Sequence, residues 1–318
     1  MKPTETIKDY LLAKCGVDAV GIAPVSAFAD EPEGHRPEDV MPGAKSVIVF
    51  TKRIPDGAIQ AALRYHEDGN QDALSVYGAY GCDLTPNMNL FFVEFNLCEF
   101  IERHFGYTGA PVPCGPNQNI TPWNVPLPSF IGPKKMDYII HPDRAAVAAG
   151  LGELGWNNLL ITPENGPRQQ IGLIVTSMEL DCDAPYDGPR LCDPASCHVC
   201  SGVCPMHAIP EAGEADEFTI AGKKASCAHI EQNACAVASL GLRSEFTVKG
   251  KGADLLMSDH PTDEELQEAY DAKPASANTL DHYPKHTCNK CLLYCPAGNW
   301  KERFGDKGLS RFDGKECA

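Results

Sequence analysis

The sequence predicts a mixed α+β protein (α/β-like in its first half) made of two parts that meet near residue 180. At 318 residues the chain is long enough for about two domains of roughly 150 residues each. Its first half alternates between runs typical of strands and runs typical of helices. From about Asp181 the sequence changes to cysteines, prolines, histidines and short polar stretches. We therefore expect two domains, residues 1–180 and residues 181–318.

The first part opens with two apolar runs, Asp18–Ala23 and Ser46–Thr51, which we predict to be buried strands. Apolar residues then recur at helical spacing over Asn87–Arg103. Seven prolines between Gly109 and Pro133 break both regular structures, so a long irregular loop is expected there. The part closes with a helix-like stretch (144–149), a glycine-rich turn (150–155) and two strand-like runs (158–162 and 171–177).

Charge and composition exclude several classes of protein. Lys and Arg number 27 against 43 Asp and Glu, and the resulting net charge of -16 repels nucleic-acid backbones. No apolar window approaches the roughly 18 residues of a membrane span, and no export signal follows Met1, so we expect a cytoplasmic protein. In that reducing compartment, 15 cysteines indicate metal or redox chemistry rather than disulfides.

Two segments share one cysteine spacing, and each ends in Cys-Pro. This pattern matches the end of the bacterial ferredoxin motif, in which closely spaced thiolates bind one iron–sulfur cluster and the cysteine before proline binds the other. It therefore predicts two 4Fe-4S clusters. The alternative is a pair of zinc sites, which also use Cys-x2-Cys but need no Cys-Pro three residues later. The segments are Cys197-x2-Cys200-x3-Cys204-Pro205 and Cys288-x2-Cys291-x3-Cys295-Pro296.

Two clusters need eight thiolates, and these segments supply six. Cys192, five residues before Cys197, is predicted to complete the first cluster through an enlarged loop. Cys227 is the better candidate for the second cluster, with Cys235 in reserve. The predicted ligand sets are Cys192, Cys197, Cys200 and Cys295 for the first cluster, and Cys204, Cys227, Cys288 and Cys291 for the second.

The segment Arg144–Arg168, followed by the two cysteine segments, resembles the cobalamin-dependent reductive dehalogenases and the epoxyqueuosine reductases. The likeness extends from about Gly16 onward. It implies a nitroreductase-like domain that binds cobalamin, followed by a ferredoxin-like domain with two 4Fe-4S clusters. It also supports Cys227, because epoxyqueuosine reductases place a cluster cysteine after the first Cys-Pro segment.

The resemblance further implies two candidate proton donors. Asp137 lies seven residues before Arg144, where epoxyqueuosine reductases have their proposed acid, while dehalogenases use a tyrosine and Tyr138 is adjacent. The alternative is that Asp137 caps the following helix or pairs with Lys134 or Lys135.

The resemblance also assigns cobalamin contacts to the glycine-rich turn and the residues after it. The glycines would allow close backbone approach to a large planar ligand, and the polar side chains would bind corrin amides. The alternative is an ordinary turn between a helix and a strand. The predicted contacts are Gly150, Gly152, Gly155, Asn157, Asn158, Leu160, Thr162 and Arg168.

The function that the resemblance implies is an oxidoreductase. An external donor of the ferredoxin or flavodoxin type would fill the clusters, and cobalamin would reduce a small organic substrate. A second hypothesis makes a corrinoid itself the substrate. A third treats the chain as an electron carrier that has clusters alone. The sequence identifies neither the substrate nor the oligomeric state.

Overall fold

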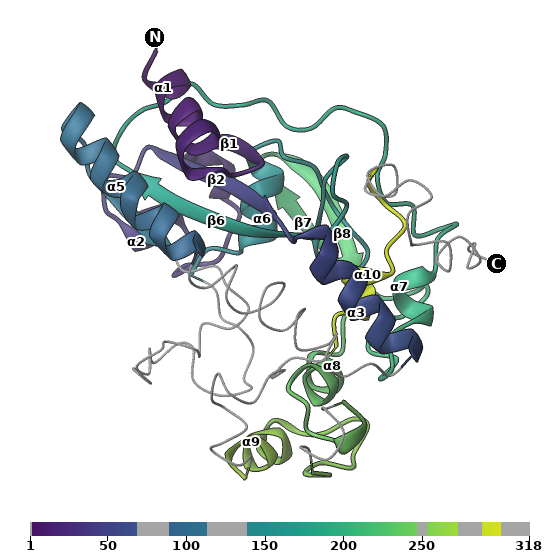
Figure 1. The fold of residues 1–318 in the computed structure, drawn as a ribbon. Coiled ribbons are helices and arrows are strands. Elements are labelled where there is room, and N and C mark those ends of the chain that lie inside the picture. The colour runs from purple at the N-terminus through teal and green to yellow at the C-terminus, as the bar shows by residue number, and fades with distance from the viewer. Residues whose placement is uncertain (1, 69–88, 113–138, 247–252, 273–287, 300–318) are drawn as a thin grey trace.

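A mixed helix and sheet architecture is present in the computed structural model, which describes residues 2–68, 89–112, 139–246, 253–272 and 288–299 (Figure 1). Its main sheet has four antiparallel strands in the order β1-β2-β6-β3. The two central strands, β2 and β6, pair along their full length, from Ser46 opposite Thr176 to Arg53 opposite Gln169. The strands are β1 (Ala19–Pro24), β2 (Ser46–Arg53), β3 (Gly109–Val112) and β6 (Gln169–Thr176).

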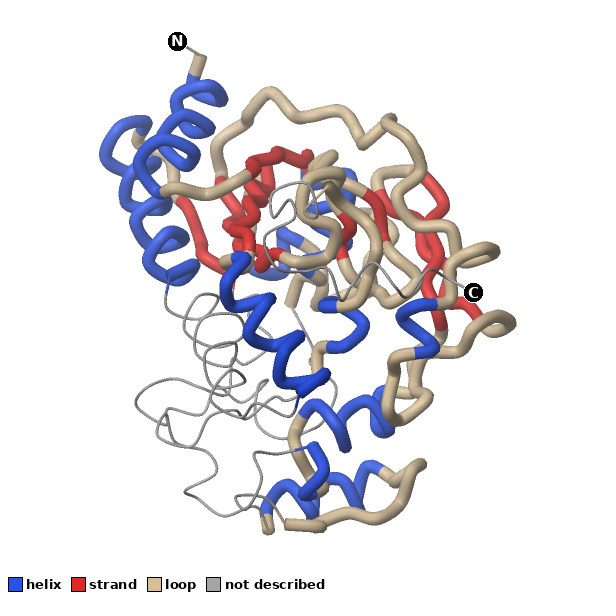
Figure 2. The backbone as a smooth tube through the Cα atoms, turned by 45° about the vertical axis from the view of Figure 1, so that its right-hand side comes forward, coloured by secondary structure: helices blue, strands red, loops and turns tan. Residues whose placement is uncertain are grey.

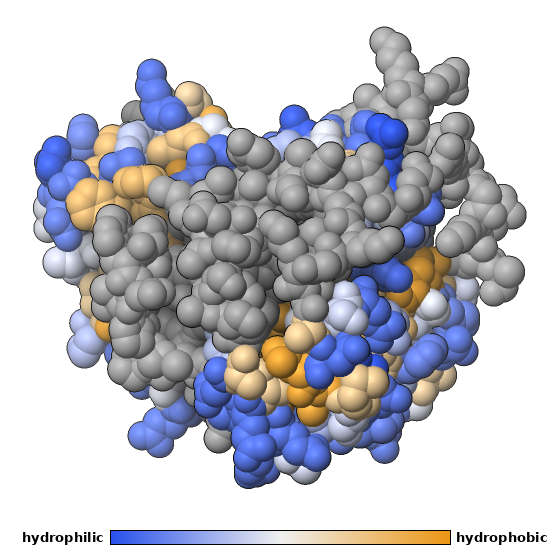
Figure 3. Space-filling view, turned by 60° about the horizontal axis from the view of Figure 1, so that its bottom comes forward, coloured by the Kyte–Doolittle hydropathy of each residue, from blue (hydrophilic) through white to orange (hydrophobic). Residues whose placement is uncertain are grey.

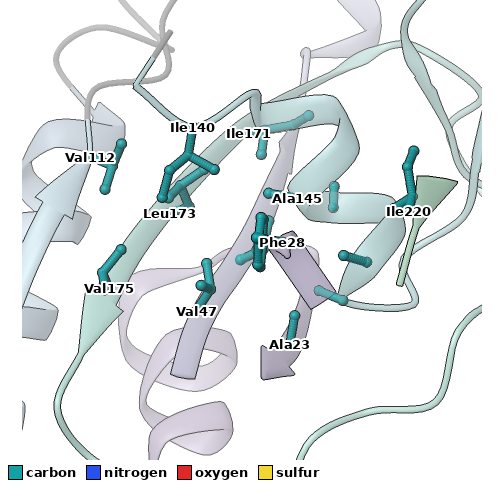
Figure 4. Packing of buried hydrophobic residues seen from close by; sticks show 14 of the residues in the cluster. Ala23, Phe28, Val47, Val112, Ile140, Ala145, Ile171, Leu173, Val175 and Ile220 are labelled. Carbon is teal, nitrogen blue, oxygen red and sulfur yellow. The ribbon is translucent and has the colours of Figure 1, made fainter. Parts of the chain in front are cut away.

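Both faces of this sheet are buried. Successive side chains of a strand point to opposite faces, so Ile48 and Phe50 of β2 enter one core while Val47 and Val49 enter the other. Figure 4 shows the second core, in which Phe28 and Ala145 pack against the sheet. Helices α1 and α5 lie together beside the sheet in Figure 2, and their apolar residues fill the first core. The covering helices are α1 (Pro3–Asp9), the π-helix η1 (Tyr10–Cys15), α5 (Phe91–Phe105) and α6 (Pro142–Ala148).

The regular elements predicted for the first half are confirmed within a few residues. Strands β1, β2 and β6 and helices α5 and α6 match the predicted runs. The irregular loop is corrected at its start, because Gly109–Val112 forms strand β3. Proline is tolerated there because β3 lies at the edge of the sheet and pairs only with β6. The rest of that loop, from residue 113, lies outside the described residues.

A β-hairpin and several short helices follow in the second half. Strands β7 and β8 pair from Ala215 opposite Ala228 to Ile220 opposite Lys223. The two residues between them, Ala221 and Gly222, both have positive φ, as the tight turns of hairpins require. The remaining elements are 3-10 helix η2 (Val25–Phe28), α2 (Pro37–Val40), α3 (Asp56–Asp68), β4 (Glu153–Leu154), β5 (Leu160–Ile161), α7 (Val199–Gly202), β7 (Ala215–Ile220), β8 (Lys223–Ala228), α8 (Gln232–Ser239), 3-10 helix η6 (Ser244–Phe246), α9 (Asp263–Asp271) and α10 (Lys290–Leu293).

Helix α3 connects the two halves of the sequence. Its residues Ile59 and Leu63 share a buried apolar core with Leu292 and Leu293 of α10, next to Cys291. The last cysteine segment is thus fixed against an element that lies more than 200 residues earlier in the chain. Contacts therefore cross the predicted boundary near residue 180, and the assignment of two domains stays a prediction.

On the face shown in Figure 3, hydrophilic residues surround smaller apolar patches over the described surface. Within the described ranges, no helix combines the length and the apolar content needed to cross a bilayer.

One acidic side chain, Glu94 of α5, lies inside the first core with 2% of its surface exposed. The backbone N–H of Leu173 donates a hydrogen bond to its Oε1 at 3.3 Å. Burial raises the pKa of Glu94 well above the usual value, and this hydrogen bond opposes the rise only in part. The folded protein therefore holds Glu94 in its protonated form at pH values at which the unfolded chain releases the proton.

We expect this group to make the protein less stable as pH rises. Above the ordinary carboxyl pKa the unfolded state loses the proton while the folded state keeps it, so unfolding becomes more favourable by up to about 1.4 kcal/mol per pH unit. The substitution Glu94→Gln removes this difference. The gap in melting temperature between Glu94→Gln and wild type should therefore move in favour of the variant between pH 5 and pH 7.5. A constant gap, equal to that of the exposed control Glu102→Gln on the same helix, would contradict it.

Candidate metal centre

The two Cys-Pro segments lie side by side. Each places its middle cysteine on a short helix, Cys200 on α7 and Cys291 on α10, and the two helices are in contact. In both segments the chain turns through one helical turn, which presents two sulfurs three residues apart on the same side. Every described cysteine is a free thiol.

A first group of thiols gathers around Cys200. Burial is the main reason that the pKa of Cys200 rises to about 11, and charges at Cys192 and Cys197 contribute to that rise. Burial likewise raises the pKa of Cys295 to about 11, with contributions from Cys192 and Cys200. Such effects act only over short distances, so these four sulfurs are neighbours. They are the four cysteines predicted for the first cluster.

A second group gathers around Cys291. Burial raises its pKa well above the usual value, and the charges of nearby thiols act in the same direction, those of Cys235 and Cys288 more than those of Cys200 and Cys204. Burial raises the pKa of Cys235 to about 12, with further contributions from Cys288 and Cys204. The second group therefore consists of Cys204, Cys235, Cys288 and Cys291. Three of these were predicted, and Cys235 was the reserve.

Cys227 lies elsewhere. It is fully buried on β8, where burial raises its pKa to about 12 and its charged neighbours are Asp216, Arg144 and Asp143. The next residue, Ala228, packs on the side that faces the cysteine segments. Because alternate residues of a strand point to opposite sides, Cys227 points away from the other sulfurs. The preference for Cys227 over Cys235 is therefore not supported by this geometry.

An apolar wall lies beside the thiols. Trp156, Ile209 and Ala228 form its buried part, and cysteines of both groups pack against it. Backbone N–H groups point at sulfur, and among them Trp156 donates to Cys192 and Ala208 donates to Cys204, each at 3.3 Å. Among the described residues, no three Cys, His, Asp or Glu side chains form a site for a single metal ion.

The glycines of the turn 150–155 contact the protein itself. A Cβ on Gly152 would lie 2.0 Å from the carbonyl oxygen of Ile161, and one on Gly150 would lie 2.2 Å from that of Ala184. At Gly155 a Cβ would meet the side chains of Asn157 and Ile161. The space that these glycines leave is thus filled by the chain, as in the alternative of an ordinary turn.

The residues that follow the turn hold the second cysteine segment in place. Asn157 donates from Nδ2 to the carbonyl oxygen of Cys291 at 3.3 Å, and Arg168 donates to three carbonyls of residues 293–297. Thr162 donates from its hydroxyl to Gln169 at 2.9 Å, and the side chain of Leu160 is buried. Of the predicted polar cobalamin contacts, Asn158 keeps a buried Oδ1 without a hydrogen-bond partner.

The two candidate proton donors, Asp137 and Tyr138, lie outside the described residues, so their roles stay predictions. Two residues of the site were not predicted as part of it. Trp156 closes the apolar wall and donates to Cys192, although its position between the glycine-rich turn and Asn157 gives no sign of this. Ala208 donates to Cys204 through its backbone, for which its side chain provides no signal.

Comparison of sequences provides the family context. No family model matches the chain. Over 123 residues it is 35% identical to the tetrachloroethene reductive dehalogenase of Dehalobacter restrictus, and equally to that of Desulfitobacterium hafniense. The chain is similar to the reductive dehalogenases. The matched region makes up 38% of this chain and 18% of the dehalogenase, so the chain spans less than a fifth of the curated relatives that it matches. The predicted resemblance to dehalogenases is confirmed, and these relatives are reductases.

Solved structures of reductive dehalogenases and of epoxyqueuosine reductases are also similar to this chain. A catabolic reductive dehalogenase has 17% sequence identity and a TM-score of 0.46, with 91% of this chain and 37% of that chain covered. The epoxyqueuosine reductase of Bacillus subtilis has 15% sequence identity and a TM-score of 0.42, with 90% of this chain and 70% of that chain covered. A further dehalogenase structure is described in terms of B12-dependent dehalogenation, and one epoxyqueuosine reductase was solved with a tRNA stem loop.

Proposed function

We propose that this chain is an iron–sulfur reductase that carries two 4Fe-4S clusters within residues 181–318. The observation that carries the proposal is the convergence of two groups of four half-buried thiols, drawn mainly from segments about 90 residues apart in sequence. The Cys-Pro cysteine of each segment joins the group of the other segment, as in two-cluster ferredoxins. The proposed ligands are Cys192, Cys197, Cys200 and Cys295 for the first cluster, and Cys204, Cys235, Cys288 and Cys291 for the second.

The chemistry of the donors fits this cofactor. Burial raises the pKa of Cys200 and of Cys295 to about 11, so these two thiols hold their protons until a metal displaces them. When bound, the clusters would supply one-electron transfer. The protein's own contribution is to exclude water with the Trp156 wall and to donate hydrogen bonds to sulfur from Trp156 and Ala208.

Cobalamin is the second cofactor in the proposal, and it rests on similarity to the dehalogenases alone. The described residues do not fit the predicted corrinoid site, because its glycines pack against the chain and Asn157 and Arg168 bind the cysteine segment. Asn158 keeps a buried acceptor, its Oδ1, without a hydrogen-bond partner. The lack of fit favours the second candidate function, an electron carrier that holds clusters without cobalamin.

The substrate and the partners are proposed by class. By analogy with the dehalogenases we propose a small organic substrate, and as electron source a ferredoxin or flavodoxin. The prediction that no nucleic acid is bound rests on the net charge of -16, even though one structurally similar epoxyqueuosine reductase was solved with tRNA. The cytoplasmic location also stays a prediction.

The metal content tests the first part of the proposal. Chain purified without oxygen should contain about eight iron atoms and a matching amount of acid-labile sulfide, with the broad visible absorption of 4Fe-4S clusters. Zinc without iron or sulfide would contradict the proposal and support the alternative of two zinc sites.

Retention of cobalamin distinguishes the proposed cobalamin-dependent reductase from the proposed electron carrier. A cobalamin-dependent reductase, reconstituted with iron, sulfide and cobalamin, should keep corrinoid absorption through gel filtration, in proportion to protein. A matched sample of chain with clusters but no added cobalamin provides the baseline spectrum. Loss of all corrinoid absorption, with the cluster band retained, would contradict the cobalamin-dependent reductase and favour the electron carrier.

A further inference from the structure

Strands β4 and β5 form a short hairpin whose tip, residues 155–159, contacts both groups of thiols. Two backbone hydrogen bonds close the tip. The N–H of Gly155 donates to the carbonyl oxygen of Leu159 at 2.8 Å, and the N–H of Asn158 donates to that of Gly155 at 2.9 Å. Asn158 has a φ of +57°, a left-handed conformation that asparagine adopts more readily than most residues. The tip is therefore a tight turn with a defined backbone.

Trp156 connects this tip to the first group of thiols. Its backbone N–H donates to the sulfur of Cys192 at 3.3 Å. Two further hydrogen bonds hold Trp156 in place. Its carbonyl oxygen accepts from the N–H of Ala228 at 2.9 Å, and its indole Nε1 donates to the carbonyl oxygen of Pro210 at 2.7 Å. The position of Cys192, a ligand of the proposed first cluster, is thus tied to the tip.

Asn157, the next residue, connects the tip to the second group. Its Nδ2 donates to the carbonyl oxygen of Cys291 at 3.3 Å. Cys291 lies on the short helix α10, and the last carbonyls of a helix have no donor within the helix, so Asn157 supplies one. The other side of the amide packs against Gly155, where a Cβ would lie 2.6 Å from Oδ1. This packing and the hydrogen bond leave the amide little freedom, and 6% of Asn157 is exposed.

We infer that the tip fixes the position of the two clusters relative to each other, with Asn157 as the positioning residue. Consecutive residues contact one ligand of each cluster, because Trp156 binds Cys192 and Asn157 binds Cys291. Transfer between the clusters moves one electron from the reduced to the oxidised one and breaks no bond, and its rate falls steeply with separation. The external donor named above supplies the electron. This inference rests on the proposed clusters and gives Asn157 a role other than the cobalamin contact predicted from the sequence.

A second buried asparagine offers a matched control. Asn165, in the loop after β5, is also 6% exposed. Its side-chain Oδ1 has no hydrogen-bond partner, so replacing the side chain breaks no bond of that oxygen. Leucine is close in shape to asparagine and lacks its polar atoms. Asn157→Leu and Asn165→Leu therefore make the same change at equally buried positions, and only the first removes the hydrogen bond to Cys291.

The test is electron paramagnetic resonance of the whole chain with both clusters loaded and reduced by dithionite. Two reduced clusters that lie close together split each other's signals, and the splitting depends steeply on their separation, so wild type should show one well-defined splitting. Loss of a buried hydrogen bond shifts the balance between held and displaced positions of the cysteine segment about tenfold toward the displaced ones. Asn157→Leu should therefore lose the defined splitting. Asn157→Asp keeps the shape but turns the donor into an acceptor, so it should lose the splitting too, whereas Asn165→Leu should keep it.

Iron and sulfide per chain, measured on the same samples, separate this inference from the proposed function. Wild type without iron and sulfide refutes the clusters, and the inference with them. Fully loaded Asn157 variants with the splitting of wild type, a loaded wild type without any splitting, or an equal loss in Asn165→Leu would refute the inference alone. If one Asn157 variant fails to load both clusters, the other decides. Failure of both, with Asn165→Leu intact, refutes it too, because Asn157 would then serve the assembly of a cluster and not the distance between two.

Discussion

Replacing Cys235 by alanine should remove about half of the iron that the chain binds, from about eight atoms to about four, whereas Cys227→Ala should keep it all. Cys235 lies on α8 with its thiol next to Cys288 and Cys204, so its loss leaves the second cluster with three ligands. Cys227 faces Asp216 and Arg144 and contributes to no group of thiols in the described structure. Iron and acid-labile sulfide per chain, measured after gel filtration without oxygen, give the result.

The pair of variants provides its own control for folding. Both replace a thiol inside the protein by a methyl group, and both remove similar volume, so a general loss of stability would affect them alike. Far-ultraviolet circular dichroism should show the same helix and strand content in both. The reverse result, iron lost in Cys227→Ala and retained in Cys235→Ala, would restore the ligand set predicted from the sequence and refute the arrangement described here.

Cys235 lies among the other thiols and Cys227 does not, and this difference shows which parts of the site can be predicted from local sequence. The spacing within each Cys-Pro segment is a property of one turn of chain, and the structure places the cysteines of the two segments near one another. The proposed eighth ligand, Cys235, lies on a separate helix whose position depends on how α8 packs against α9, a contact between distant residues. Neither Cys227 nor Cys235 carries a local signal that reveals which side of its element faces the clusters.

Contacts with a ligand are also difficult to predict from the sequence, as the glycine-rich turn shows. The sequence correctly indicates that Gly150, Gly152 and Gly155 lie where a side chain would not fit. It does not indicate what occupies the space, and here the carbonyls of Ala184 and Ile161 occupy it at the first two positions. The strands were easier to predict, because a sheet buried on both faces needs continuous apolar runs such as those of β2 and β6.

The second large effect should come from Gly298, three residues after Cys295. Its φ is +90°, which side chains rarely adopt, and a Cβ there would lie 2.3 Å from the nitrogen of Gly166. We expect Gly298→Ala to cost about 1–2 kcal/mol from the backbone conformation and about 1–3 kcal/mol more from the clash. The clash also pushes residues 295–298 away from Arg168, so iron should be lost from the first cluster on mild heating before the sheet unfolds.

Gly34 separates the two contributions, because its φ is also +90° but a Cβ there has no atom within 4 Å. Gly34→Ala should therefore show only the cost of backbone conformation, and it should keep all its iron. The measurements are the melting temperature and the temperature at which the cluster absorption bleaches, compared for both variants and wild type. Equal losses for the two variants would mean that the contact between Gly298 and Gly166 does not hold the cysteine segment in place. A larger loss confined to Gly298→Ala, with early bleaching, would show that the turn 162–168 fixes the ligand Cys295, as the bonds from Arg168 require.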